Sequence, residues 1–209
     1  MAVTMTEIQQ LLDIEDLHYI SDTQKNIICI PIQINGDQVT VFIYIMEDGE
    51  YILFRIPWFA DASQAVNKEA LYSKMLSLQN EFKLGRFVLD TDCKEIAFES
   101  YIAAEDGEVT LLQVRRHLAA IMQTVARYRQ GIRHLAKEGV YTDIDGEEDT
   151  LRKLFEGFSL DSEEAESAYN GGDSEEDIDF RNGGIQIPLE KEPIGIAEIL
   201  KKIWKSLWQ

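Results

Sequence analysis

The stretch that decides the fold is NIICIPIQINGDQVTVFIYIMEDGEYILFRI, residues Asn26–Ile56. β-branched and aromatic residues fill it with a period of two, which is typical of half-buried strands. Two turn dipeptides divide it, Asn35-Gly36 and Asp48-Gly49, and both tolerate the positive φ of a tight hairpin. The stretch therefore predicts a three-stranded antiparallel meander. Pro31 has no amide hydrogen, so we expect the first strand at an edge of the sheet.

Helical periodicity lies on both sides of the meander. Thr6 can cap a first helix that runs to about Leu17. After Pro57 the apolar residues recur at intervals of 4, 3 and 4, which predicts a second helix over Asn67–Lys83. The buried stripe of this second helix consists of Leu71, Met75, Leu78 and Phe82.

A second hairpin and a long helix complete the predicted order. Gly85–Asp90 and Glu95–Ile102 form the hairpin, and Thr110 with Gln113 makes the capping box of a helix from Leu111 to about Glu138. The order α-β-β-β-α-β-β-α predicts an α+β fold, an antiparallel sheet with helices packed on one side. The last helix would be about 42 Å long. That length exceeds the width of a small sheet, so we expect part of this helix to pack on another chain.

This order of elements resembles the type III secretion chaperone-like fold, and within it the YbjN-type group. The resemblance rests on LSLQNEFKLGRFVLD, Leu76–Asp90, which joins the middle helix to its next strand. The matching residues are Leu78, Asn80, Leu84, Gly85, Arg86, Phe87 and Asp90. The resemblance covers about residues 6–138. It implies a homodimeric, non-enzymatic protein that binds other polypeptides, and it transfers no catalytic residues.

Charge divides the chain into three parts. The whole chain of 209 residues has a formal net charge of -18, of which residues 1–138 carry -7, residues 139–192 carry -13 and residues 193–209 carry +2. The first part is the predicted chaperone-like domain. The second is too acidic and polar to bury a core, so we expect a largely disordered connector, in which Leu151–Phe158 keeps the spacing of a short docking helix. A negative field of this size disfavours nucleic-acid binding.

The third part, residues 193–209, has the pattern of an amphipathic helix. Glu198, Lys201, Lys202 and Lys205 lie opposite an apolar stripe. The stripe consists of Ile196, Ile199, Leu200, Ile203, Trp204, Leu207 and Trp208. A helix of about 22 Å is too short to cross a bilayer. Three uses stay open: packing on this protein's own core or on a dimer mate, recognition of a partner protein, or association with a membrane surface.

The long helix has a basic stripe beside its apolar face, made of Arg115, Arg129, Arg133 and Lys137. This stripe is either a solvated face or an electrostatic docking site for the acidic connector or an acidic client. If it holds the connector, added salt should make residues 159–180 more sensitive to proteases.

The remaining chemistry-bearing residues predict no enzyme, no metal site and no cofactor. His18, His117 and His134 are separated and are expected at the surface or at helix edges, while Cys29 and Cys93 are expected as small core or hairpin residues. Residues 141–152 imitate a calcium loop but lack its two essential carboxylates. The first twelve residues have neither the basic nor the apolar region of a secretory signal. We therefore expect a cytoplasmic protein.

Together these observations predict a protein-binding chaperone or adaptor that holds or recruits another polypeptide during assembly, trafficking or regulation. One alternative is a peripheral membrane adaptor that uses residues 193–209 at the lipid headgroups. A weaker alternative is a small-molecule sensor with a pocket under the sheet. The sequence names no client.

Overall fold

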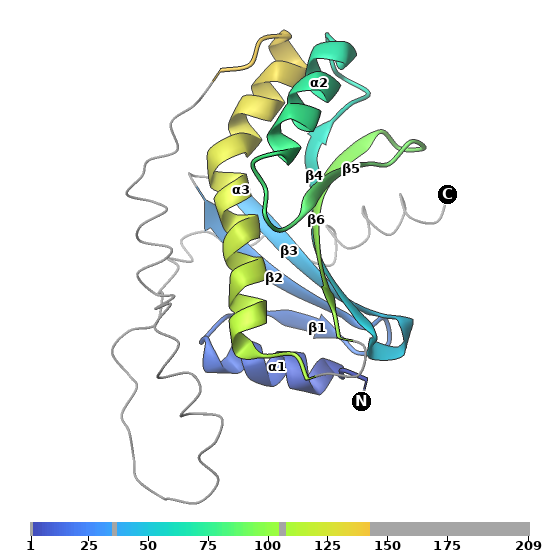
Figure 1. The fold of residues 1–209 in the computed structure, drawn as a ribbon, viewed down its shortest axis with the longest axis vertical. Coiled ribbons are helices and arrows are strands. Elements are labelled where there is room, and N and C mark those ends of the chain that lie inside the picture. The colour runs from blue at the N-terminus through green and yellow to red at the C-terminus, as the bar shows by residue number, and fades with distance from the viewer. Residues whose placement is uncertain (1, 35–36, 105–107, 143–209) are drawn as a thin grey trace, which may run out of the picture.

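A computed structural model describes residues 2–34, 37–104 and 108–142. These residues form a six-stranded antiparallel sheet of order β1-β2-β3-β4-β6-β5, against which three α-helices pack (Figure 1). The predicted α+β class is therefore confirmed. All but the first four residues of the connector, the amphipathic segment and most of the calcium-like loop lie outside the described residues.

The predicted meander forms the centre of the sheet. It consists of β2 (Ile27–Ile34), β3 (Asp37–Met46) and β4 (Tyr51–Asp61), joined in antiparallel register. Between β3 and β4 the chain turns through η1 (Glu47–Gly49). Strand β4 continues past the predicted end at Ile56, with an irregularity in its pairing to β6 between Ile56 and Ala60. Trp58 lies in this irregularity with a left-handed φ of 51°, which a bulged strand can accommodate.

The prediction that the first meander strand lies at an edge was wrong. A short additional strand, β1 (Ile20–Asp22), pairs with residues 27–29 of β2. Sequence patterns did not indicate β1 because three residues are too few to show a period. Pro31 pairs with Thr40 of β3 and lies beyond the end of β1. At Pro31, β1 has already ended, so no described strand on that side of β2 needs a hydrogen bond from this residue. A proline, which has no amide hydrogen, is therefore tolerated there.

The second hairpin lies on the other side of β4. It consists of β5 (Arg86–Leu89) and β6 (Glu95–Ala103), and β6 pairs with both β4 and β5. Gly85 precedes β5 with a φ of +87°, and a Cβ built on it would lie 2.6 Å from the Phe98 ring. Only glycine satisfies both the left-handed backbone and the close approach. This explains the glycine in the LGRF sequence.

Helices α1 (Met5–Ile14) and α2 (Lys68–Gln79) begin at side-chain caps. The first cap is Thr4 and not the predicted Thr6. Thr4 and Glu7 form a reciprocal capping box, in which the Glu7 carboxylate accepts the Thr4 amide at 2.7 Å. Two threonines compete for this role, and the glutamate three residues after Thr4 decides between them. The second helix is capped by Asn67 and ends four residues before the predicted Lys83.

Helix α3 (Leu111–Glu138) has the predicted bounds and the predicted Thr110–Gln113 capping box. It ends at Gly139, whose φ of 76° is the left-handed conformation of a helix C-cap. Its buried residues extend from Val114 to Ala136, and it crosses the sheet and then continues beside α2 (Figure 1). The apolar face is thus covered inside one chain, so helix length is no argument for a second chain. The homodimer stays a prediction.

Candidate functional site

The sheet has two faces with different neighbours. On one face, alternate strand residues such as Ile28, Ile43 and Phe54 join one core with the buried apolar residues of α1, α2 and α3. The strand residues between them point to the opposite side. Cys29, Phe42, Leu53 and Ala97 are buried there but do not belong to that core. We call the opposite side the outer face and define it by Cys29, Phe42, Tyr44, Leu53, Arg55, Ala97, Glu99 and Tyr101.

The outer face is apolar at its centre. Strand register places Cys29 beside Phe42, and Tyr44 beside Leu53. The rings of Phe42 and Tyr44 stack with their centroids 6.2 Å apart. Phe42 is only 2% exposed and Leu53 only 7%, and burial raises the pKa of the Tyr44 hydroxyl to about 12. None of the described helices contributes to this packing. The centre of the outer face is therefore an apolar surface that no helix among the described residues covers.

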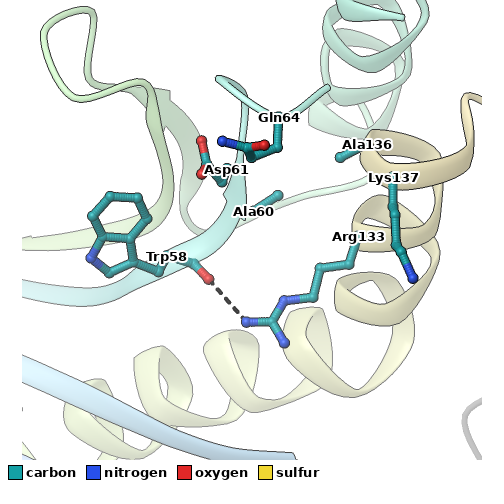
Figure 2. A pocket seen from close by; sticks show the side chains of 7 residues that line it. All are labelled: Trp58, Ala60, Asp61, Gln64, Arg133, Ala136 and Lys137. Carbon is teal, nitrogen blue, oxygen red and sulfur yellow. Dashed lines mark hydrogen bonds between the residues drawn. The ribbon is translucent and has the colours of Figure 1, made fainter. Parts of the chain in front are cut away.

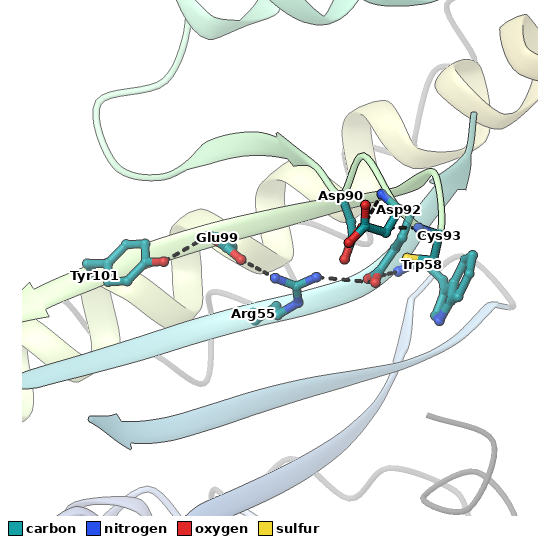
Figure 3. Close-up of polar contacts among 8 residues, drawn as sticks. Arg55, Trp58, Asp90, Asp92, Cys93, Glu99 and Tyr101 are labelled. Atoms are coloured by element: carbon teal, nitrogen blue, oxygen red, sulfur yellow. Dashed lines mark hydrogen bonds and ion pairs between the residues drawn. The ribbon is translucent and has the colours of Figure 1, made fainter. Parts of the chain in front are cut away.

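A polar network continues the outer face toward β6 (Figure 3). Arg55 Nη2 lies 3.2 Å from the Glu95 carboxylate, and Arg55 Nη1 donates to Glu99. Glu95 also accepts the Trp58 amide at 2.9 Å, and Glu99 accepts the Tyr101 hydroxyl at 2.9 Å. Burial alone would lower the pKa of Arg55, but the two carboxylates outweigh it and raise that pKa. One guanidinium balances two carboxylates, so the network has one excess negative charge.

The sequence analysis did not predict this network, although a signal was present. Arg55 shares its side of β4 with Leu53, and Glu95, Glu99 and Tyr101 share one side of β6. The signal was a single arginine, Arg55, within an otherwise mostly apolar strand, together with two glutamates on one side of a second strand. Arg55 and Glu99 are 44 positions apart, so the pairing itself required the β4–β6 register.

Beside the network, Asp90, Cys93 and Glu95 bring three metal-ligand atoms within 4.8 Å of one another. The Asp90 carboxylate accepts the amides of Asp92 at 2.8 Å and Cys93 at 3.1 Å, and these bonds fold the β5–β6 turn. They also lower the pKa of Asp90, while burial raises that of the Cys93 thiol. Glu95 is paired with Arg55 on β4, so two of the three groups, Asp90 and Glu95, already have structural partners.

The predicted basic stripe is divided in the structure. Arg115 lies at one end of α3, where it donates to Glu15 at 2.5 Å. Arg129 and Arg133 lie together and share Asp37, at 3.9 Å and 3.7 Å. Lys137 contacts its neighbour Glu138 at 3.7 Å and is otherwise exposed. Each residue therefore has an acidic partner inside the described domain, and docking of the connector on this stripe stays a prediction.

Arg129 is the unusual member of this stripe. It is 6% exposed, and its Nε and Nη1 atoms have no hydrogen-bond partner among the described residues. Burial, followed by the adjacent Arg133, lowers the pKa of Arg129 to about 10, against the opposite effect of Asp37. The Arg129 guanidinium is thus buried in the described domain with fewer hydrogen bonds and ion pairs than would offset the loss of its hydration.

A cleft of about 410 Å³ lies between the bulged part of β4 and the end of α3 (Figure 2). Arg133 reaches across it and donates to the carbonyl oxygens of Phe59 at 3.3 Å and Trp58 at 3.4 Å. Its guanidinium therefore supports the backbone beside the left-handed Trp58. The sequence analysis missed this cleft because no local pattern brings β4 and α3 together. Its lining is Trp58, Ala60, Asp61, Gln64, Arg133, Ala136 and Lys137.

The structure corrects the expectation for His117. This side chain is 8% exposed, stacks on Phe54, and its Nδ1 forms a hydrogen bond with the Ser100 hydroxyl at 2.7 Å. Burial lowers its pKa. The pair resembles a nucleophile with its base, but Ser100 is 1% exposed and lies in the core, where no substrate reaches it. His134 lies near the surface and contacts the Val140 carbonyl at 2.8 Å.

Comparison with known families decides the relationship of this chain. The family model YbjN, described as "Putative bacterial sensory transduction regulator", matches residues 4–134. The chain belongs to the YbjN family. The match ends shortly before the end of α3, so the acidic connector and residues 193–209 lie beyond it. No curated protein matches this YbjN-family chain.

Solved structures similar to this YbjN-family chain include YbjN from E. coli, with 18% identity, a TM-score of 0.45, and coverage of 59% of this chain and 89% of that one. The ExsC–ExsE complex has 13% identity and a TM-score of 0.43 over 60% of this chain and 92% of that one. The HopA1–SchA chaperone–effector complex has 12% identity and a TM-score of 0.44 over 61% and 98%. In the described part of the chain, no helix has the length and apolarity needed to span a membrane.

Proposed function

We propose that this YbjN-family protein is a non-enzymatic chaperone or adaptor and that the outer face of its sheet holds another polypeptide. The observation that carries the proposal is the apolar centre of this face, where Phe42, Tyr44 and Leu53 pack without a described helix above them. Protein-binding surfaces combine such an apolar centre with a polar margin.

The margin of the outer face has this character. Tyr101 is 39% exposed and donates its hydroxyl to Glu99, which pairs with Arg55. Arg86 lies opposite Glu99 on β5, with its guanidinium 5.3 Å from the centre of the Tyr101 ring. An extended polypeptide with apolar side chains and a few basic ones would match both the centre and the excess negative charge.

The core of the domain supports a non-enzymatic role. Among the described residues, the hydroxyl–imidazole pair of Ser100 and His117 is enclosed in the core. The Arg133 guanidinium in the cleft is engaged by backbone carbonyls. Both groups have structural partners, and neither is arranged to act on a ligand.

Site-specific photo-crosslinking in cells tests the proposal. A photo-crosslinking amino acid replaces Tyr101 on the outer face, and a matched control replaces Leu76, which is 70% exposed on α2. We expect adducts with a defined set of other polypeptides from position 101 and not from position 76. Equal labelling at the two positions, or adducts at position 101 with this chain alone, would contradict the proposal.

The homodimer, the cytoplasmic location and the membrane-associated alternative are proposals as well. Light scattering of the purified chain measures its mass and tests the dimer. Flotation with lipid vesicles tests the membrane alternative, since only a peripheral membrane protein floats and loses flotation after Trp204→Ala with Trp208→Ala.

A further inference from the structure

We propose that residues 193–209 dock on the outer face of the sheet of their own chain. The segment would then occupy the surface that a client needs, as a built-in competitor. The inference goes beyond the proposed function, because docking of this segment requires no client.

The outer face is apolar and buried at its centre, as expected for a sheet face against which another element packs. Phe42, Leu53 and Ala97 are 2%, 7% and 1% exposed on a face to which α1, α2 and α3 do not contribute. A sheet that is apolar on both faces is stable when each face packs against another layer. The three described helices all pack on the opposite face. Among the described residues, no helix covers the outer face.

Residues 193–209 match this position in size and pattern. As a helix, Ile194–Trp208 is about 22 Å long and carries one continuous apolar stripe. The apolar part of the outer face spans β2, β3, β4 and β6, and neighbouring strands are about 4.8 Å apart, which gives a width of about 14 Å. The helix can therefore cross all four strands while the lysines opposite its stripe remain in solvent.

The intervening chain is long enough to reach. The described domain ends at Thr142, and 50 residues separate it from residue 193. A flexible chain of that length has a root-mean-square span of about 35–42 Å, comparable with the length of α3, about 42 Å. Tethering also gives the segment a local concentration that can reach the millimolar range. Docking within the chain is therefore favoured over docking between chains.

Charge supports the same choice. Residues 193–209 carry +2, whereas residues 1–138 carry -7, and the Arg55 network on the outer face has one excess carboxylate. Asp90 and Asp92 lie beside that network. The lysines of the segment would stay on its solvent side, where the negative field of the domain attracts the segment without a direct contact between a lysine and the face. A second copy of the outer face would instead bring like charges together.

The reactivity of Cys29 provides the test. This thiol lies beside Phe42 on the outer face and is 6% exposed. The full-length chain carrying Cys93→Ser has Cys29 as its only thiol. In that chain, Ile203→Ser with Trp204→Ser interrupts the apolar stripe, and Lys205→Ala on the opposite side of the segment is the matched control. The measured quantity is the rate at which a maleimide labels Cys29.

We expect the stripe variant to raise the labelling rate at least about tenfold, because each large apolar side chain that leaves a buried contact is worth about a factor of ten or more. The control should not change the rate, and the increase should be independent of protein concentration. Circular dichroism checks that the domain stays folded in each variant.

Three results would overturn the proposal. Equal rates in all variants would show that the segment does not cover the face. An increase that appears only at concentrations where the chain dimerises would assign the segment to a second copy. Unchanged rates together with loss of vesicle binding in the stripe variant would assign it to a membrane. Crosslinking at position 101 reports client binding separately, so the two proposals can fail independently.

Discussion

Replacing Arg55 with methionine tests whether the outer face is a buried layer. Methionine keeps most of the volume of the side chain but leaves the carboxylates of Glu95 and Glu99 without their cation. Those side chains are 6% and 5% exposed and Arg55 is 18% exposed, so water compensates little. Removing one partner of a buried ion pair costs about 3–5 kcal/mol. That is a large part of the about 5–15 kcal/mol by which a domain is stable.

Urea denaturation measures this loss. With a slope of about 2 kcal/mol per molar urea, the midpoint should fall by about 2 M. Arg55→Met combined with Glu95→Gln and Glu99→Gln should recover most of it. Arg86→Met, an exposed arginine beside the same network, is the control and should cost less than about 1 kcal/mol. A change at Arg55 as small as the control would refute the reasoning.

Two further predictions concern α3. Burial lowers the pKa of His117, so the unfolded chain takes up a proton at a pH where the folded chain does not. The free energy of unfolding should therefore decrease as the pH falls below about 6.5, by at most about 1.4 kcal/mol per unit, and His117→Gln should remove this slope in urea titrations. Arg129→Met should raise the free energy of unfolding by about 1–3 kcal/mol, because two buried nitrogens of Arg129 lack acceptors in the part of the chain that the structure describes. Thermal melting measures this, with the exposed Arg127→Met as the control; a lower melting temperature would show that the contact with Asp37 outweighs the burial.

The sequence was most informative where structure is local. Both bounds of α3 follow from a cap at Thr110 and a glycine at position 139, and each signal acts within one helical turn. The strands of the meander follow from period-two patterning and turn dipeptides. Errors occurred where two local signals competed, as at Thr4 and Thr6, or where an element is very short, as in β1.

The candidate site could be predicted only in part. Alternation along β3 and β4 already places Phe42, Tyr44, Leu53 and Arg55 on one side of the sheet, but it cannot say which side the helices cover. His117 and Arg129 showed the same limit. The sequence predicted His117 at the surface or at a helix edge, and Arg129 on a solvated or docking face. The strands that bury them are distant in sequence.

By itself, the sequence determined the α+β class, the order of the predicted helices and strands, and the uneven charge, with residues 139–192 acidic and residues 193–209 basic. These properties depend on composition and on hydrogen bonds or side-chain spacing within a few residues. Only the tertiary structure decided that Arg55 joins Glu95 and Glu99, that Arg133 supports the bulge of β4, and that one face of the sheet has no described helix above it. Those facts depend on strand register and helix packing between residues tens of positions apart, which local patterns do not encode.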